Sequence, residues 1–274
     1  MYQAYWQLAA KPFEPFGDPR FYYPSDSQQG AILKLRYAIE NRRQGAVLAG
    51  GCGLGKTMLA QAILRQLSDS FAPRVQLVFP QFSTGELLAY LADQLTGSRL
   101  SSTSPAALDA SLSRIETRLI ENAKSQKHAV IVVDEAHLLR DTSALETIRL
   151  LMNLEYHSQP LATFILVGQT SLLLAIEQMP DLEERLAVKC LVRRFSLAET
   201  MAYVQHRLSA AGCQRAIFED EAIESVHHLT QGIPRRINRL CDLALLVGFA
   251  EELPAISAEH IESVSTELAS AIAE

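Results

Sequence analysis

The chain has 274 residues, of which 48% are hydrophobic and 20% charged, and this composition excludes intrinsic disorder for the chain as a whole. Its net charge of −6 disfavours a general nucleic-acid binder, and its four scattered cysteines, with no CxxC pair, disfavour a zinc site and a disulfide framework. The longest apolar run spans about eight residues, against the ~20 that a membrane-spanning helix needs. Because the N-terminus also lacks a signal-peptide pattern, we expect a cytoplasmic protein without a membrane span.

Residues 1–24 are rich in aromatic residues and prolines, which predicts an irregular strap. Short apolar strands then alternate with helices, and such alternation indicates an α/β fold with a parallel sheet covered by helices on both faces. The strands are predicted at 46–49, 74–79, 129–133, 162–167 and 188–192, and helices at about 58–67, 84–95, 106–125 and 144–153. Two further helical stretches are predicted, one capped by Ser25 or Asp26 with its last apolar position at Ile39, and one that follows the strand 162–167 and ends at about Ala187.

From residue 196 onward the pattern is purely helical, with helices predicted at about 197–211, 219–230, 234–250 and 257–272. The charge changes at the same place. Residues 196–274 include 5 basic and 12 acidic residues, which give a net charge of −7. Residues 1–195 include 20 basic and 19 acidic residues, which give a net charge of +1. We therefore predict two domains, an α/β domain over 1–195, which includes the strap, and an all-helical domain over 196–274.

The segment GGCGLGKT fits the Walker A pattern GxxxxGK[ST] and lies between a predicted buried strand and a predicted helix. In such a P-loop the glycines let backbone N–H groups curl around phosphates, and the helix N-terminus adds positive potential. Lys56 is expected to reach the β- and γ-phosphate oxygens of ATP, and the Thr57 hydroxyl to ligate Mg²⁺. The predicted nucleotide-binding residues are Gly50, Gly51, Cys52, Gly53, Leu54, Gly55, Lys56, Thr57 and Met58.

The predicted strand 129–133 ends in Asp134 and Glu135, as in a Walker B motif. Two carboxylates at the end of a buried strand are costly unless they face a metal ion and a reacting water. We expect Asp134 to hold Mg²⁺ through its water shell and Glu135 to act as general base. The string Asp-Glu-Ala-His also occurs in one helicase class, but those proteins need two cores and this chain has one P-loop; His137 is expected to begin a helix.

A polar pair, Gln169 and Thr170, follows the predicted strand 162–167, and parallel strands end at one edge of a sheet. Gln169 is our candidate for positioning the lytic water or sensing the γ-phosphate. Thr170 is the alternative sensor, or else the cap of the next helix.

Several arginines stand at positions that suggest a nucleotide-facing role. Arg185 lies just before a predicted strand, and Arg235 opens a helix within the acidic C-terminal part, where neighbouring acids disfavour a nucleic-acid contact through Arg235, Arg236 and Arg239. A further basic stretch, with Lys34, Arg36, Arg42 and Arg43, is predicted to be a solvated helix face, with DNA contact as the alternative.

The order of these motifs along the chain resembles that of an AAA+ ATPase with an α/β core and a helical lid. The motifs are the P-loop, the strand that ends in Asp-Glu, the third strand with its polar end, Arg185, and the helix that begins with Gly-Ile-Pro-Arg. The opening from Tyr5-Trp6 to Pro24-Ser25, together with Val167-Gly168-Gln169 and the segment 234–238, is similar to the ExeA type, general secretion pathway protein A, across essentially the whole chain. Such proteins usually continue into a membrane helix and a peptidoglycan-binding domain, which this sequence lacks, so the likeness covers the ATPase module alone.

The resemblance to this family implies roles for three further parts of the chain that the spacing of the motifs alone does not indicate. Arg235 would be the second sensor, which reaches the γ-phosphate from the lid, and the strap would lie near the adenine. Arg185 would be the arginine finger that enters a neighbouring copy's site, with Arg193 and Arg194 as competitors for that role.

The resulting hypothesis is a Mg²⁺-dependent AAA+ ATPase that assembles with copies of itself upon ATP binding and acts as a switch or motor on a partner complex that the sequence does not identify. Type II secretion is the first process to consider. One alternative is a DNA-associated regulator, such as a transposition helper ATPase, that uses the basic helix and the polar loop 97–105. Another is a switch that binds ATP and barely hydrolyses it, which the intact Glu135 disfavours.

Overall fold

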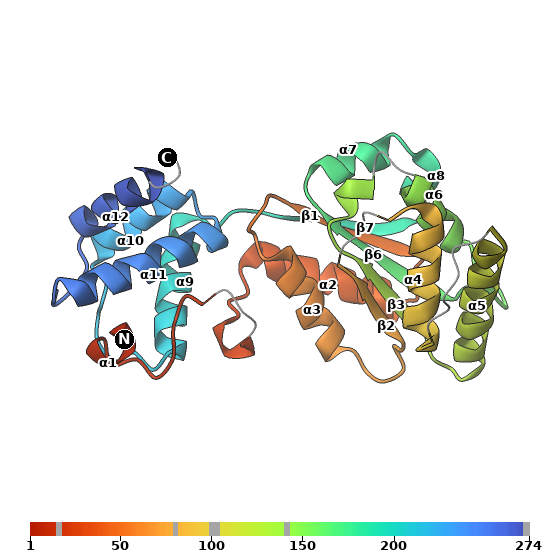
Figure 1. Cartoon of the computed structure of the whole chain (residues 1–274), viewed down its shortest axis with the longest axis horizontal. Helices are drawn as coiled ribbons and strands as arrows, with labels where there is room; N and C mark the ends of the chain where they lie inside the picture. Colours follow the sequence, from red (N-terminus) through yellow and green to blue (C-terminus); the bar gives the residue numbers. More distant parts are fainter. Residues whose placement is uncertain (15–17, 79–81, 99–104, 140–142, 271–274) are drawn as a thin grey trace. The chain divides into compact units, whose positions relative to one another are not determined.

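The computed structural model describes residues 1–14, 18–78, 82–98, 105–139 and 143–270 (Figure 1). Contacts within the chain divide it into two compact units. The first, here called the sheet unit, comprises Ser27–Cys52 and Lys56–Val192. The second, here called the helical unit, comprises Met1–Asp26, Gly53–Gly55 and Arg193–Glu274. The strap thus packs with the helical part of the chain, while the division into domains at residue 195 stays a prediction.

The sheet unit contains five parallel strands in the order β2-β3-β6-β1-β7. Every residue of β1, β3 and β6 is buried, as expected for apolar strands that are covered on both faces. The strand bounds are β1 (Gly45–Gly50), β2 (Arg74–Leu77), β3 (Ala129–Val133), β6 (Ala162–Gly168) and β7 (Leu186–Val192). The predicted parallel sheet is confirmed.

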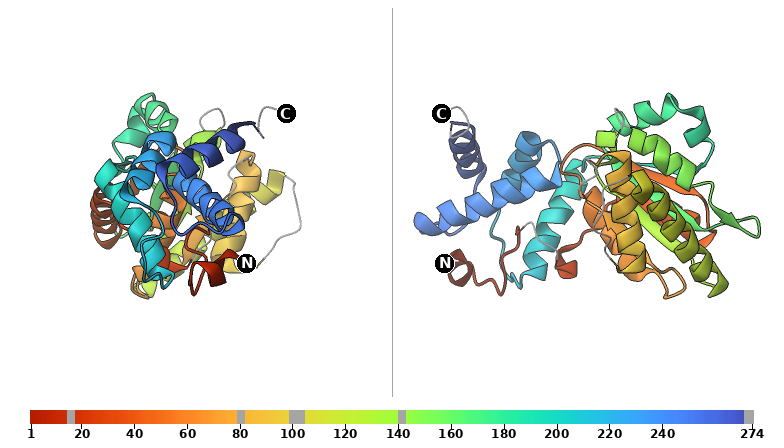
Figure 2. Two further views of the ribbon diagram at one scale, coloured as in Figure 1. Left: turned by 90° about the vertical axis from the view of Figure 1, so that its left-hand side faces the viewer. Right: turned by 45° about the vertical axis from the view of Figure 1, so that its right-hand side comes forward.

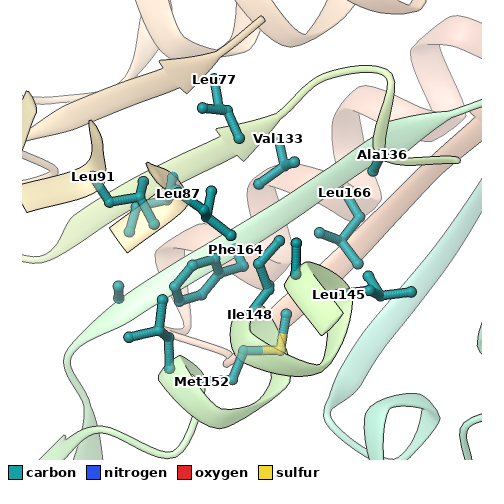
Figure 3. Packing of buried hydrophobic residues seen from close by; sticks show 14 of the residues in the cluster. Leu77, Leu87, Leu91, Val133, Ala136, Leu145, Ile148, Met152, Phe164 and Leu166 are labelled. Atoms are coloured by element: carbon teal, nitrogen blue, oxygen red, sulfur yellow. The ribbon is translucent and has the colours of Figure 1, made fainter. Parts of the chain in front are cut away.

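Helices flank both faces of this sheet, α2 and α3 on one side and α4, α5 and α6 on the other (Figure 1). They are α2 (Asp26–Glu40), α3 (Lys56–Gln66), α4 (Thr84–Thr96), α5 (Pro105–Lys124), the 3-10 helix η2 (Ala136–Leu139), α6 (Ser143–Leu151), α7 (Ser171–Glu177) and α8 (Pro180–Glu183). Figure 3 shows the core on one side of the sheet, where Phe164 of β6 contacts residues of α4 and α6.

One small element of this unit was not predicted. A hairpin of β4 (Glu155–Tyr156) and β5 (Gln159–Pro160) precedes β6. Its two loop residues, His157 and Ser158, both have positive φ, 50° and 60°, as a tight two-residue hairpin loop requires. The sequence has neither asparagine nor glycine there, so the usual signal for such a turn is missing.

The helical unit has α9 (Leu197–Ala210), α10 (Asp220–Thr230), α11 (Pro234–Ala250) and α12 (Ala258–Ser270), preceded in the chain by the short helices α1 (Tyr2–Tyr5) and η1 (Pro19–Phe21). It has its own hydrophobic core, separate from that of the sheet unit. In both views of Figure 2 the red N-terminal strap lies beside the blue helices of this unit. Trp6 of the strap is fully buried and donates a 2.8 Å hydrogen bond from Nε1 to the Leu245 carbonyl. Within the described residues, no helix combines the length and apolar character that a bilayer crossing demands.

Arg207 of α9 holds the strap by its backbone. Its guanidinium, on a residue only 3% exposed, donates to the carbonyls of Pro12, Glu14 and Phe21, and lies 4.9 Å from the Phe21 ring centroid. Replacing it would leave buried carbonyls without donors, which is costlier than the loss of exposed contacts.

We therefore expect Arg207→Met to lower the free energy of unfolding by about 3 kcal/mol, measured by urea denaturation with the tryptophan fluorescence of Trp6 as the probe. Arg215→Met is the matched control, because exposed Arg215 contacts the Trp6 ring at 5.0 Å and should contribute less than about 1 kcal/mol. Equal stability of the two variants would show that Arg207 does not hold the strap.

Candidate nucleotide-binding site

The P-loop begins where β1 ends and leads directly into α3, which starts at Lys56. Gly53 and Gly55 have φ values of 78° and 83°, a backbone region that glycine enters without a Cβ clash. Lys56 is 8% exposed, and its Nζ donates a 2.8 Å hydrogen bond to the Gly51 carbonyl, so the amine is folded back over the start of the loop. Its ammonium can exchange this neutral acceptor for a phosphate oxygen, which makes the stronger charge-assisted bond.

The strand order brings the predicted motifs to one edge of the sheet. Strand β6 lies between β1 and β3, and all three are parallel, so their carboxyl ends share that edge. In register, Ala49 pairs with Gly168, and Val133 pairs with Leu166. The start of the P-loop, the Asp134-Glu135 pair and Gln169 therefore follow three adjacent strands at about the same level.

Asp134 is a buried carboxylate at this edge, 2% exposed. Its backbone N–H donates to the Leu77 carbonyl at 2.8 Å, which ties it to β2, and its Oδ1 accepts a 2.9 Å bond from the Glu135 N–H. Among the described residues it forms no ion pair. A buried carboxylate in this state fits a nearby cation, since a buried charge is costly without a counterion.

The oxygen ligands predicted for Mg²⁺, the Thr57 hydroxyl and the Asp134 carboxylate, are of the hard type that Mg²⁺ prefers. Within the described ranges, no group of three or more His, Cys, Asp or Glu side chains could hold a metal ion. Mg²⁺ usually keeps several of its waters and binds substrate phosphates, so it needs few protein ligands.

Glu135 has a backbone φ of +51°, in the left-handed region. For a residue with a side chain this costs about 1–3 kcal/mol and is typical of functional sites. Its side chain is 47% exposed, so the carboxylate is open to water. The ring of His137 lies beside it, with Nδ1 3.4 Å from Glu135 Oε2.

His137 is the second residue of η2, not its first, and its ring contacts two predicted site residues. Besides lying beside Glu135, its Nδ1 accepts a 3.4 Å hydrogen bond from the backbone N–H of Gln169. Sequence reasoning treated His137 as a residue of helix initiation only. The signal that could have found it was its position two residues after Glu135, in the same turn.

Gln169 and Thr170 both follow β6 with exposed side chains. Thr170 occupies the N-cap position of α7, yet its side chain makes no capping hydrogen bond. Both residues thus lie at the functional edge, and the choice of Gln169 as first sensor stays a prediction.

Arg185 lies at the other end of the strands from the P-loop, where the parallel strands begin. It precedes β7, where Leu186 pairs with Gly45 at the start of β1, whereas the P-loop follows Gly50, which pairs with Val192. Five residues of extended strand separate the two ends by about 17 Å. Arg193 and Arg194 follow the other end of β7, and Arg194 donates to Gln231 Oε1 at 2.5 Å.

Around Arg185 the surface forms a polar cavity of about 520 Å³. Arg42 and Arg43 line it as well, and none of these three arginines takes part in an ion pair between described residues. Arg185 donates from Nε to Asn153 Oδ1 at 2.7 Å and from Nη1 to the Asp181 carbonyl. The nearby Glu146 is paired with Arg149, whose hydrogen bonds, together with the charges of Arg149 and Arg185, keep the pKa of that carboxyl below its ordinary value.

Arg235 belongs to the helical unit, as do residues 53–55 of the loop by their contacts. Gly232 precedes it with φ +67°, and a Cβ there would lie 2.1 Å from the Phe195 carbonyl oxygen, so this turn requires glycine. Pro234 then begins α11. The Arg235 backbone N–H donates to the Gly53 carbonyl at 3.2 Å, and its side chain is exposed, as are those of Arg236 and Arg239.

Of the basic residues on α2, Lys34 and Arg36 are exposed, and Arg36 pairs with Glu40 at 3.0 Å. All four cysteines are free, and Cys52 in the P-loop is exposed.

The AAA domain family matches residues 39–176 of the chain. General secretion pathway protein A of Aeromonas hydrophila is 32% identical over 253 residues, which are 91% of this chain and 45% of that protein. The chain therefore spans less than half the length of this relative.

Among solved structures, the ORC2 protein of Aeropyrum pernix, in ADPNP–ADP complexes, superposes with a TM-score of 0.70 at 15% identity, over 94% of this chain and 71% of that one. Drosophila ORC bound to DNA superposes with a TM-score of 0.71 at 17% identity, over 97% of this chain and 65% of that one. The Thermotoga maritima RuvB Holliday junction branch migration motor superposes with a TM-score of 0.62 at 19% identity, over 94% of this chain and 73% of that one. At these identities the likeness shows the fold alone.

Proposed function

The chain belongs to the AAA family of ATPases, and from this premise we propose that it hydrolyses ATP in a Mg²⁺-dependent reaction and acts as a nucleotide-driven oligomeric switch or motor on a partner complex. The observation that carries the proposal is the convergence of three features at one edge of the sheet. They are the P-loop with its buried lysine, the buried Asp134 and the water-accessible Glu135.

In the proposed reaction, residues from Gly50 to Met58 bind the phosphates, with the Lys56 ammonium on the β- and γ-oxygens. Thr57 and Asp134 hold Mg²⁺, which neutralises charge that develops on the transferred phosphoryl group. Glu135 accepts the proton of the attacking water. Gln169 senses the γ-phosphate at the same edge, and Arg235 acts as the second sensor.

Arg185 is proposed to act on a neighbouring copy. Its separation of about 17 Å from the end of β1 is too large for a side chain to reach the nucleotide of its own P-loop. The arginine lies where the strands begin, and the P-loop lies where they end. This arrangement favours a head-to-tail contact between copies, the type of interface that generates rings or filaments. ATP would lie in that contact, so we propose that ATP promotes self-assembly.

Removal of Mg²⁺ tests the metal dependence. With excess chelator, we expect phosphate release from ATP to fall to background, because in the proposed reaction Mg²⁺ neutralises the charge that develops on the phosphates; added Mg²⁺ should restore the release. The measurement is steady-state phosphate release, with calcium as a control ion that has longer bonds and looser geometry. Turnover that persists in chelator would refute the metal dependence.

The likeness to general secretion pathway protein A supports a cytoplasmic role linked to type II secretion, with a partner complex of that pathway. Capture experiments with a Glu135→Gln variant kept in ATP would test this, since slow hydrolysis prolongs the ATP state. Recovery of no secretion component would count against the link.

A DNA-associated role is the second proposal, supported by the exposed basic residues Lys34, Arg36 and Arg43 on and just after α2. It is less favoured, because the chain as a whole carries a net charge of −6. Of the predicted DNA-facing loop 97–105, residues 99–104 lie outside the described part of the chain. Duplex DNA binding that requires ATP and weakens steeply with salt would support this role, whereas indifference to DNA at low salt would exclude it.

A further inference from the structure

The polar cavity of the sheet unit lies at the opposite end of β1 from the P-loop, where Leu186 of β7 pairs with Gly45 of β1. Arg185 directly precedes Leu186, and Arg42 and Arg43 stand shortly before Gly45. Strand pairing therefore brings three arginines from two distant parts of the chain to one cavity of about 520 Å³. Sites for small molecules have volumes of roughly 300–1,000 Å³, so the cavity has the size of such a site.

The lining of this cavity has an excess of positive charge. It contains three guanidinium groups against two carboxylates, those of Glu155 and Glu184, and none of the five forms an ion pair between described residues. A guanidinium binds the oxygens of a phosphate group through two parallel N–H donors. The two carboxylates can accept hydrogen bonds from hydroxyl or amine groups of the same ligand.

The backbone of Arg42 is in a conformation that favours glycine, with φ +49°. Its N–H donates to the Ile39 carbonyl at 2.9 Å, and the Arg43 N–H donates to the Ala38 carbonyl at 2.8 Å. These two bonds form a Schellman motif at the end of α2, in which the residue at the place of Arg42 is usually glycine. The helix dipole also favours a cation here, but Arg43 supplies one without a left-handed backbone. Strained positions of this kind cluster at ligand-binding sites.

The two other arginines are held in place before any ligand binds. Arg43 donates from Nη2 to the Tyr37 hydroxyl at 3.4 Å, and its carbonyl accepts a 2.6 Å bond from Oγ1 of the buried Thr163. Arg185 donates from Nε to Asn153 Oδ1 at 2.7 Å and from Nη1 to a backbone carbonyl of α8, so its Nη2 is left for a ligand. Side chains that are already ordered lose less conformational entropy when a ligand binds.

We propose that Arg42, Arg43 and Arg185 form a second anion site, which binds a small phosphate-bearing molecule with hydroxyl or amine groups and thereby inhibits ATP hydrolysis. The inhibition rests on the proposed function of Arg185 at the ATP of a neighbouring copy. A guanidinium that binds a phosphate in its own cavity cannot also reach that ATP. The ligand and the neighbouring copy therefore compete for Arg185, and each weakens the binding of the other.

The first test measures binding without turnover, by isothermal titration calorimetry with pyrophosphate in the absence of Mg²⁺. The protein is Lys56→Ala, whose P-loop lacks its ammonium. Adding Arg42→Gly should weaken pyrophosphate binding at least about tenfold, since it removes charge-assisted hydrogen bonds. The melting temperature should stay or rise, because glycine suits the left-handed position. Arg36→Ala is the matched control on α2, where Arg36 is exposed and paired with Glu40, and it should leave binding unchanged. No binding, or equal binding in both variants, would overturn the anion site.

The second test measures steady-state phosphate release with Lys56 intact, at constant free Mg²⁺ and concentrations where copies assemble. Pyrophosphate should lower kcat of the wild type. In Arg42→Gly it should only raise KM for ATP, by competition at the P-loop. A wild-type kcat that pyrophosphate leaves unchanged, or an equal reduction in both proteins, would overturn the inhibition. If the wild type releases no phosphate from ATP, the proposed ATPase function fails, and the calorimetry still decides whether the cavity binds anions.

Discussion

Replacing either Lys56 by alanine or Glu135 by glutamine should reduce ATP turnover at least about 100-fold, the size of effect found for a lost general base or a lost charge-stabilising donor. The two losses differ in origin. Lys56 is buried and hydrogen-bonded to the loop, so Lys56→Ala removes the ammonium that we propose binds the phosphates and should also weaken ATP binding. Glu135→Gln keeps the shape of the side chain and removes only its basicity, so it should bind ATP as the wild type does.

Phosphate release measures turnover, and equilibrium titration with a fluorescent ATP analogue measures binding. Lys127→Ala and Glu177→Gln serve as matched controls, because both residues are exposed and lie on the sheet unit away from the site. Both controls should behave as the wild type. Undiminished turnover in both Lys56→Ala and Glu135→Gln would exclude the proposed catalytic site.

Replacing Arg185 by alanine should leave ATP binding intact and reduce hydrolysis about 1,000-fold at concentrations where copies assemble, in the range reported for arginine fingers. The side chain lies at the sheet edge away from its own P-loop and beside the polar cavity with Arg42 and Arg43. Lysine should not rescue it, because an ammonium lacks the planar fork of donors.

A mixing experiment distinguishes action on a neighbouring copy from action within one chain. Arg185→Ala has an intact Glu135, and Glu135→Gln has an intact Arg185, so head-to-tail contacts between the two inactive variants would create complete sites. We expect the mixture to recover part of the wild-type turnover. Arg42→Ala is the control from the same cavity and should hydrolyse ATP normally.

Normal hydrolysis by Arg185→Ala at assembling concentrations would show that Arg185 is not the finger. Arg193→Ala and Arg194→Ala would then be mixed with Glu135→Gln in the same way.

The parts of the site that were predictable are those encoded by short stretches of chain. The P-loop was found because its glycines, lysine and threonine stand at fixed spacing between a strand and a helix, and the structure has β1 and α3 there. The Asp134-Glu135 pair was found because a fully apolar run, β3, ends in two carboxylates. The late helix was recognised from glycine and proline ahead of Arg235, since both residues restrict the backbone locally.

Tertiary structure alone decided which of these segments meet. Strand order places β6 between β1 and β3, and it puts Arg185 at the opposite edge from the P-loop. The tertiary structure also brings His137 between Glu135 and the Gln169 amide, and it buries Trp6 among the C-terminal helices. Local periodicity specifies the type and length of an element but not its neighbours, because pairing and packing depend on residues far apart in the chain. The sequence therefore determined the chemistry available to this protein, and the fold decided which groups can act on the same nucleotide.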